Sequence, residues 1–67
     1  MELYKHFKGN TYIKLHEAIH SETGENLVIY ACTKTGKIYA RPVVMFYDYI
    51  DREEYKGRRF VKETSNE

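Results

Sequence analysis

The chain has 67 residues, a formal net charge of +1 and one cysteine, Cys32. A chain this short forms a single domain with a small core, its balanced charge argues against general nucleic-acid binding, and a lone cysteine excludes an internal disulfide. No apolar run reaches the roughly 18 residues of a membrane span, and no signal-like start is present, so we expect a cytoplasmic protein without a membrane anchor. Seven Tyr and three Phe predict an aromatic core, and its small size favours assembly into a homo-oligomer.

The first candidate binding residues lie in the opening segment, where His6, Lys8 and Asn10 alternate opposite Phe7. Alternate side chains of an extended chain share a face, so these three groups are predicted to project together in a way that suits a phosphate. The alternative is that Gly9 and Asn10 only form a turn, with Lys8 in solvent beside it.

The next segment, from Thr11 to Ile19, begins with residues that favour a strand, and its first half alternates apolar and polar side chains. The alternation is lost at Glu17. We therefore expect a bulged strand, and the alternative is a helical turn built on Leu15, Ala18 and Ile19.

This segment also contains the H-E-x-x-H motif of zinc proteases, from His16 to His20. On a helix the two imidazoles share a face, but on a strand they lie roughly 13 Å apart, too far for one zinc ion with bonds of about 2 Å. Because the segment is predicted to be extended and no third ligand is evident, we expect no metal site and no cofactor. A zinc-dependent hydrolase is the least favoured hypothesis.

The loop that follows, residues 20–24, contains a histidine, a hydroxyl and a carboxylate in sequence. A nucleophile needs a base behind it and an oxyanion hole in front of it, and neither is apparent. A turn in which Ser21 and Thr23 bond to nearby backbone explains the pattern better, so no catalytic residue is predicted and the chain is not expected to be an enzyme.

Two neighbouring strands are predicted next. The apolar run from Leu27 to Thr33 is typical of a central strand, residues 34–37 form a tight hairpin with positive φ at Gly36, and residues 38–41 return alongside. Tyr30, Tyr39 and Arg41 are therefore expected to lie close together, where an arginine beside aromatic rings can hold a phosphate while a ring stacks on a base. The alternative is structural, with Arg41 paired to a carboxylate of Glu22, Glu25 or Asp48 while the tyrosines complete the core.

The last third begins with Pro42, which suits the first position of a helix. The apolar residues Val43, Phe46, Tyr47 and Ile50 follow at helical spacing and predict one short helical turn. Residues 51–67 carry five basic and five acidic residues around Phe60 and Val61, which predict one edge strand, and the Arg58-Arg59 pair is expected to be solvated.

These elements predict a mainly β fold: a small SH3-like barrel of about five short strands with one short helical turn after Pro42, formed by residues 1–62. Residues 63–67 are expected to be a frayed C-terminal tail.

Three blocks, YKHFKGNxY at residues 4–12, HSETGExLVxY at residues 20–30 and RPxxMF at residues 41–46, occur in this order. Together they resemble the small bacterial and phage family called domain of unknown function 1653, over about residues 3–60. The resemblance assigns no catalytic or binding residue. A small and an aliphatic residue are usual in the family at the places of His16 and Glu17, which makes the protease motif accidental. The chain departs from the pattern at residues 31–39, where the hairpin is shorter and Tyr39 replaces a frequent tryptophan.

The favoured hypothesis is a non-catalytic binding module that holds a small anionic, nucleotide-like ligand between basic and aromatic side chains. Because the resemblance includes phage proteins, a sharper form is a phage protein that sequesters a nucleotide signal of host defence. The alternative is an SH3-like protein or nucleic-acid interaction module. The expected ligand contacts are His6, Lys8, Asn10, Tyr30, Tyr39 and Arg41.

Overall fold

The computed structural model describes residues 2–63, which fold into seven strands and one short helix. The expected mainly β fold is confirmed, and so is a helical turn directly after Pro42. In chain order the elements are β1 (Glu2–His6), β2 (Thr11–Ile19), β3 (Asn26–Cys32), β4 (Ile38–Pro42), α1 (Val43–Phe46), β5 (Tyr49–Arg52), β6 (Tyr55–Arg58) and β7 (Phe60–Lys62).

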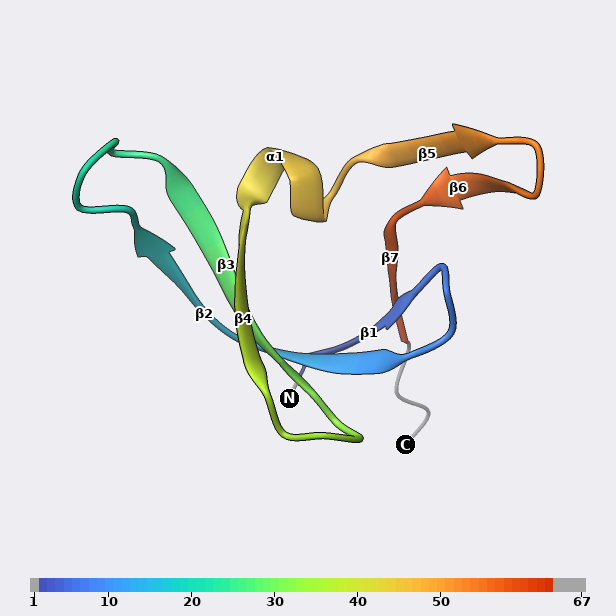
Figure 1. The fold of residues 1–67 in the computed structure, drawn as a ribbon, viewed down its shortest axis with the longest axis horizontal. Coiled ribbons are helices and arrows are strands. Elements are labelled where there is room, and N and C mark those ends of the chain that lie inside the picture. The colour runs from blue at the N-terminus through green and yellow to red at the C-terminus, as the bar shows by residue number, and fades with distance from the viewer. Residues whose placement is uncertain (1, 64–67) are drawn as a thin grey trace.

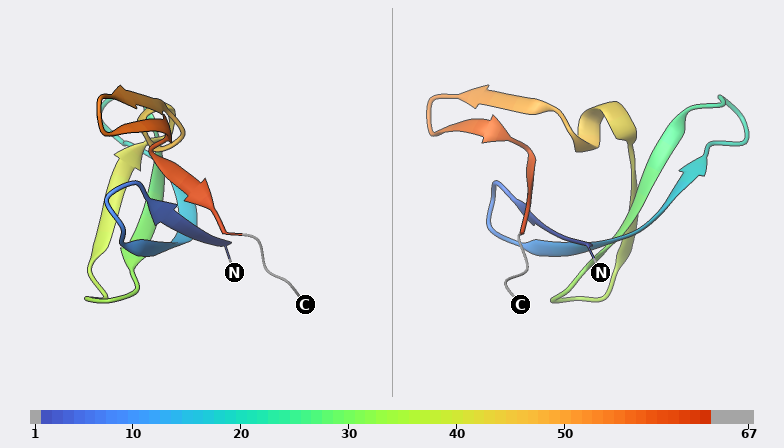
Figure 2. Two further views of the ribbon diagram at one scale, coloured as in Figure 1. Left: turned by 90° about the vertical axis from the view of Figure 1, so that its right-hand side faces the viewer. Right: turned by 180° about the vertical axis from the view of Figure 1, so that it is seen from behind.

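Five of the strands form one antiparallel sheet in the order β4-β3-β2-β1-β7, and β5 pairs only with β6 (Figure 1). The sheet curves strongly along β2, whose first half pairs with both β1 and β3 and whose second half pairs with β3 alone (Figure 2). Within residues 2–63 the edge strands β4 and β7 do not pair with each other, so the strands are not closed into a barrel. The SH3-like barrel therefore stays a prediction.

Strand β2 contains the bulge that the sequence predicted, at a different position. The register with β3 changes between Lys14 and His16, which leaves Leu15 as the extra residue instead of Glu17. The alternative prediction of a helical turn at Leu15, Ala18 and Ile19 was wrong, because this segment is extended and pairs with β3. The bulge lies where β2 leaves the core, and the five residues that follow Lys14 on β2 are exposed.

The β3–β4 hairpin agrees closely with its prediction. β3 is an interior strand with neighbours on both sides, and the buried Cys32 near its end fits the expected apolar run. Gly36 has φ of 77°, and its N–H donates to the Cys32 carbonyl at 2.8 Å. A side chain at Gly36 would be strained in this conformation, which explains why a glycine ends the turn.

The helical turn after Pro42 is shorter than its apolar spacing indicated. Helix α1 ends at Phe46, and the Tyr47 N–H donates to the Val43 carbonyl at 3.1 Å. Ile50, the last residue of the predicted period, lies on β5 with its side chain buried. The helical prediction was wrong there because the Arg59 N–H donates to the Asp48 carbonyl at 3.0 Å, which joins this stretch to the end of the β5–β6 hairpin.

The C-terminal region contains more regular structure than predicted. The β5–β6 hairpin was not foreseen, whereas the edge strand around Phe60 and Val61 is confirmed as β7. The backbone N–H of Glu63 donates to the Leu3 carbonyl at 2.8 Å, so this residue still follows β1. Residues 64–67 of the expected tail lie outside the described residues.

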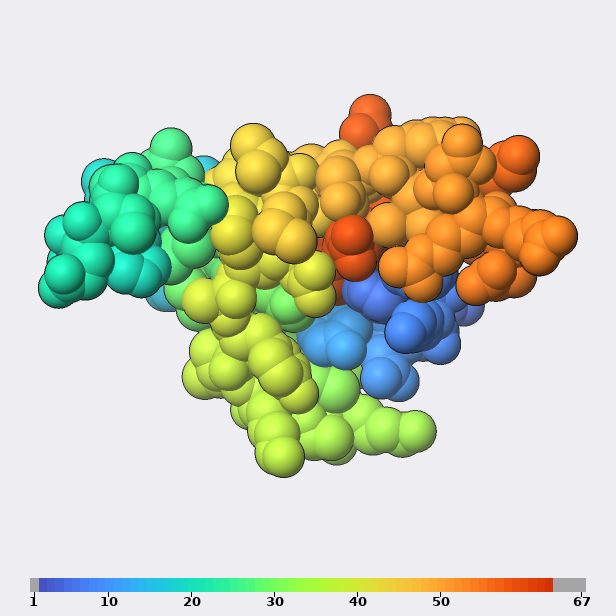
Figure 3. All heavy atoms as spheres, turned by 45° about the horizontal axis from the view of Figure 1, so that its top comes forward, coloured from blue at the N-terminus to red at the C-terminus, as the bar shows by residue number. Residues whose placement is uncertain are grey.

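An aromatic core holds the sheet and the helix together. Phe46 of α1 and Val28 of β3 are fully buried, and Tyr4, Tyr30 and Phe60 complete the cluster. Phe46 stacks on Phe60 with ring centres 4.2 Å apart and an angle of 8° between the rings. Full burial of a side chain of this size stabilises the fold by about 1.5–3 kcal/mol. In the space-filling view, the hairpin tips of residues 20–25, 33–37 and 52–55 project from this small body (Figure 3).

The helix found in residues 2–63 has four residues, so it is far too short to cross a membrane.

Candidate functional site

The candidate site is built around Phe60, because the sheet brings rings from three strands to this side chain. Antiparallel pairing places His6 of β1 directly opposite Phe60, with ring centres 4.8 Å apart. Tyr12 and Tyr30 approach the same ring edge-on at 5.6 and 5.3 Å. We call the full set the arginine–aromatic cluster: His6, Tyr12, Tyr30, Tyr39, Arg41, Arg59 and Phe60.

Arg41 is held in this cluster by a buried tyrosine. Its Nε donates to the Tyr30 hydroxyl at 3.2 Å, and its guanidinium carbon lies 5.8 Å from the centre of the Phe60 ring. Among residues 2–63, Arg41 forms no ion pair. The alternative in which it pairs with a carboxylate of Glu22, Glu25 or Asp48 is therefore not observed. The anchored guanidinium is only partly exposed and retains donors that an anion can use.

Tyr39 extends the aromatic surface beside Arg41. Tyr30 and Tyr39 are cross-strand partners, and their rings stack with centres 5.7 Å apart and an angle of 28°. Tyr30 is 4% exposed whereas Tyr39 is 42% exposed, so one ring supports the other from within the core. The predicted neighbourhood of Tyr30, Tyr39 and Arg41 is confirmed, because β3 and β4 pair as neighbouring antiparallel strands.

Arg59 was predicted to be solvated, and this was wrong. Its Nε and Nη2 donate to the two carboxylate oxygens of Asp48 at 2.8 and 3.0 Å, and its side chain is only 17% exposed. The hydrogen bonds from Arg59 lower the pKa of Asp48, and the carboxylate in turn raises the pKa of Arg59. Arg58 lies more openly and donates to the Tyr47 carbonyl at 2.8 Å. Arg59 is thus a fixed cation at the edge of the cluster.

His6 has its ring orientation fixed by the turn that follows β1. Its Nδ1 accepts a hydrogen bond from the Lys8 N–H at 3.1 Å, so the neutral ring carries its proton on Nε2. Burial lowers the pKa of His6, and the positive charges of Arg41, Arg59 and Lys8 lower it further. The ring is therefore neutral near pH 7, and its Nε2–H is a donor.

Lys8 and Asn10 do not project with His6 as predicted. β1 ends at His6, so the expected alternation does not continue through residues 7–10, which form a turn with φ of 116° at Gly9. Phe7 lies beside His6 with ring centres 4.7 Å apart instead of on the opposite face. Lys8 places its charge near this ring, while Asn10 contributes its carbonyl, which accepts the His6 N–H at 2.8 Å.

The structure therefore brings His6, Tyr30, Tyr39 and Arg41 into one cluster, places Lys8 at its margin and leaves Asn10 as a turn residue. Three further members were missed from the sequence: Tyr12, Arg59 and Phe60. Tyr12 and Lys14 lie two residues apart on the same face of β2, and this spacing was a usable signal for Tyr12. No local signal marked Arg59, because its partner Asp48 is distant along the chain.

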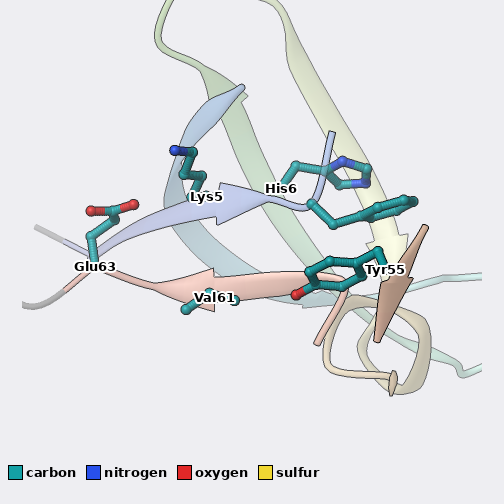
Figure 4. Close-up of a pocket in the computed structure, with 6 residues that line it drawn as sticks. Lys5, His6, Tyr55, Val61 and Glu63 are labelled. Carbon is teal, nitrogen blue, oxygen red and sulfur yellow. The ribbon is translucent and has the colours of Figure 1, made fainter. Parts of the chain in front are cut away.

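A concave feature lies beside this cluster, and we call it the outer pocket. It has a volume of about 280 Å³ and is lined mostly by apolar groups of Lys5, His6, Phe7, Tyr55, Val61 and Glu63 (Figure 4). Lys5 and Val61 are cross-strand partners on the face of β1 and β7 opposite to that of Phe60. Lys5 and Glu63 lie at one end of the pocket, and His6 and Tyr55 lie at the other (Figure 4).

The residues of the zinc-protease motif do not form a helix. His16, Glu17, Ala18 and Ile19 are exposed on extended β2, and His20 follows the strand end. Nδ1 of His20 accepts the N–H groups of Glu22 and Thr23 at 3.1 and 3.4 Å, and the Thr23 hydroxyl accepts the Glu25 N–H at 3.1 Å. This loop bonds to itself as predicted, although His20 takes the part expected of Ser21. Within residues 2–63, no three His, Cys, Asp or Glu side chains are grouped to hold a metal ion.

The fold and the cluster define a small, mainly β domain in which two held arginines lie beside aromatic rings that are mostly part of the core. The model of a family described as protein of unknown function DUF1653 matches residues 2–62, nearly the whole chain, so the chain belongs to this family. No curated protein and no solved structure matches it.

Proposed function

We propose that this protein is a non-catalytic binding module that holds a small anionic, nucleotide-like ligand at the arginine–aromatic cluster. The observation that carries the proposal is the state of Arg41: its guanidinium is anchored by the Tyr30 hydroxyl and forms no ion pair within the described residues. Folding thus immobilises a cation without a direct ion pair, although Asp48 acts on it at longer range, and this lowers the entropic cost of holding a phosphate.

The charges around His6 support an anionic ligand. Arg41, Arg59 and Lys8 each lower the pKa of His6, so all three charges act on the same small region. Asp48 offsets Arg59 through the two hydrogen bonds that join them. The whole chain has a charge of only +1, so the attraction for an anion is local and favours a small ligand over a long polyanion.

The rings beside Arg41 support a ligand with a planar group. Tyr39 is 42% exposed and rests on the buried ring of Tyr30, which holds it in place. Stacking of a base on such a ring contributes about 1–3 kcal/mol and tolerates different bases. A phosphate at Arg41 and a base at Tyr39 would use two side chains on the same face of β4.

The test is thermal unfolding of the protein with and without mononucleotides and cyclic dinucleotides, with the matching nucleosides as uncharged controls. At ten times the dissociation constant, a ligand stabilises the protein by about 1.4 kcal/mol, which raises the melting temperature of so small a domain by roughly 6–11 °C. We expect nucleotides to give a shift of this size and nucleosides a smaller one.

Two arginine variants make the test specific. Arg41→Gln removes the anchored cation and should abolish most of the shift, whereas Arg52→Gln removes an arginine outside the cluster and should leave the shift intact. The proposal is wrong if no phosphorylated compound shifts the transition, or if both variants respond like the wild type.

A sharper form of the same proposal concerns biological role. A rigid site that binds without turnover would suit a phage protein that sequesters a nucleotide signal of host defence, acting in the cytoplasm, where the single buried Cys32 stays reduced. Self-association belongs to the same proposal, since Val44 and Tyr49 are 76% and 64% exposed on a chain with a small core. Size-exclusion chromatography with light scattering tests the assembly.

The alternative function is an SH3-like interaction module for a peptide or nucleic-acid strand. The curved sheet supports it, because β4 is an edge strand on which Ile38 is 65% exposed and available to pair with an added strand. Oligonucleotide binding that falls steeply with added salt, together with no response to mononucleotides, would favour this alternative over the first proposal.

A further inference from the structure

We propose that the outer pocket is a second binding site, separate from the arginine–aromatic cluster, and that it takes a small aromatic ring carrying a carboxylate or similar anionic group. Its volume of about 280 Å³ lies just below the lower limit of roughly 300 Å³ for typical ligand pockets. One or two fused rings therefore match the space better than a whole nucleotide does.

The walls of the outer pocket favour a planar ring. Phe7 and Tyr55 stack with centres 5.3 Å apart and an angle of 23°, and the side chain of Val61 adds an aliphatic wall. Tyr55 is fixed in this position because its hydroxyl donates to the Arg58 carbonyl at 2.8 Å. Gly57 allows this placement: a Cβ there would lie 2.6 Å from the Tyr55 hydroxyl oxygen.

The charges around the outer pocket favour an anionic substituent on that ring. Lys5 lines the pocket and forms no ion pair within residues 2–63. Arg52 and Lys8 add two cations, 5.3 and 5.9 Å from the centre of the Phe7 ring. The carboxylate of Glu63 opposes them as the one acidic group of the lining. Within the lining Lys5 and Glu63 carry opposite charges, so Arg52 and Lys8 beside the Phe7 ring supply the positive excess that favours a negative ligand.

The two sites share the His6 ring, which lies between them, and the nearby charge of Lys8. His6 contacts Phe7 of the outer pocket and Phe60 of the cluster, with ring centres 4.7 and 4.8 Å apart. Arg41 lies with Phe60, so it is not part of the outer pocket. Binding at the outer pocket can therefore be tested separately from binding at the proposed nucleotide site.

The experiment uses two probes with the same ring and opposite charge, 2-naphthoate and 2-naphthylmethylamine, titrated into the labelled protein at low salt and followed by amide NMR shifts. We expect naphthoate to shift amides at Lys5, Phe7 and Val61 and to bind more tightly than the amine. Lys5→Gln should weaken naphthoate about threefold, and Tyr55→Leu should weaken it about fivefold or more. Arg41→Gln should change it little.

Gly57→Ala supplies an independent check, because its new methyl group displaces the Tyr55 ring without removing a pocket side chain. It should weaken naphthoate while leaving the nucleotide response of the cluster unchanged. The inference is overturned if the amine binds as tightly as naphthoate, if the shifts instead centre on Tyr39 and Arg41, or if both Tyr55→Leu and Gly57→Ala bind naphthoate like the wild type.

Discussion

The pair formed by Asp48 and Arg59 joins the segment after α1 to the segment before β7, and its removal should destabilise the fold. Two hydrogen bonds of 2.8 and 3.0 Å connect the carboxylate to the guanidinium. In Asp48→Asn the side chain keeps its shape but loses its charge and one acceptor oxygen. We therefore expect a loss of stability without a change of fold.

The size of this loss follows from the exposure of the two groups. Hydrogen bonds to charged groups contribute about 1.5–3 kcal/mol when buried, and exposed ion pairs contribute about 0.2–1 kcal/mol. The Arg59 and Asp48 side chains are 17% and 33% exposed, so solvent screens the pair in part. Asp48→Asn should cost about 1 kcal/mol, which lowers the melting temperature by roughly 4–8 °C.

The pH dependence gives a second signature of the same pair. The hydrogen bonds from Arg59 lower the pKa of Asp48 in the folded protein below the ordinary value of 3.8. The contribution of the Asp48 carboxylate to stability is therefore complete above about pH 4, and it is lost as the pH falls through the lower pKa of the folded state. The difference in stability between the wild type and Asp48→Asn should be constant near neutral pH and should shrink in acid.

Urea unfolding followed by circular dichroism at several pH values measures both effects. Asp51→Asn is the matched control, because Asp51 lies 3.6 Å from Lys56 with side chains 73% and 68% exposed, and its loss should change stability little. Equal destabilisation by the two variants, or a gap that persists undiminished in acid, would refute the reasoning.

Three further changes test other parts of the structure. Lys14→Met removes the hydrogen bond that the Lys14 ammonium donates to the Tyr47 hydroxyl at 3.1 Å. It should lower the free energy of unfolding by about 1 kcal/mol, measured as a lower urea midpoint. Phe46→Ala empties the fully buried centre of the core and should cost about 3–5 kcal/mol, visible as loss of a cooperative thermal transition. Because folding lowers the pKa of His6 from 6.5, stability should fall as the pH drops below that value, and His6→Gln should remove this part of the pH dependence in denaturation curves.

The strands whose signals are local could be predicted from sequence. β3 is an apolar run, Gly36 marks the hairpin that follows it, and the alternation in the first half of β2 gives its two faces. The bulge in β2 was also indicated by the sequence, because the apolar and polar residues of this strand lose their alternation and such a loss is expected where the register changes. Its position at Leu15 depends on the pairing with β3, which no local pattern contains.

The C-terminal third could not be predicted in the same way. Charged residues surround Ile50 and Phe60, and each of these two supplies a single buried position instead of a pattern. The spacing from Val43 to Ile50 fits a helix, yet α1 ends early because Asp48 bonds to Arg59 through both backbone and side chain. The Asp48–Arg59 contact, between residues 11 apart, thus ended the helix although the local apolar spacing favoured its continuation.

The same distinction applies to the candidate site. Tyr30, Tyr39 and Arg41 could be placed together because they lie on strands joined by a short hairpin. Phe60 could not be added, because β7 reaches the cluster only by pairing with β1 from the opposite end of the chain. Tyr55 of the outer pocket was missed for a similar reason, since its hairpin packs on the β1–β2 turn through the stack with Phe7.

The two arginines of the cluster are held in different ways, and this difference bears on the anion site proposed above for a nearly neutral chain. Asp48 holds Arg59 through two hydrogen bonds, whereas Arg41 is held by the Tyr30 hydroxyl and feels the Asp48 carboxylate only at longer range. His6 adds no charge near pH 7, because burial and the neighbouring cations lower its pKa. Arg41 is therefore the cluster arginine that the proposed anion would use, so one substitution at that residue should remove the proposed binding while the aromatic core that supports it stays folded.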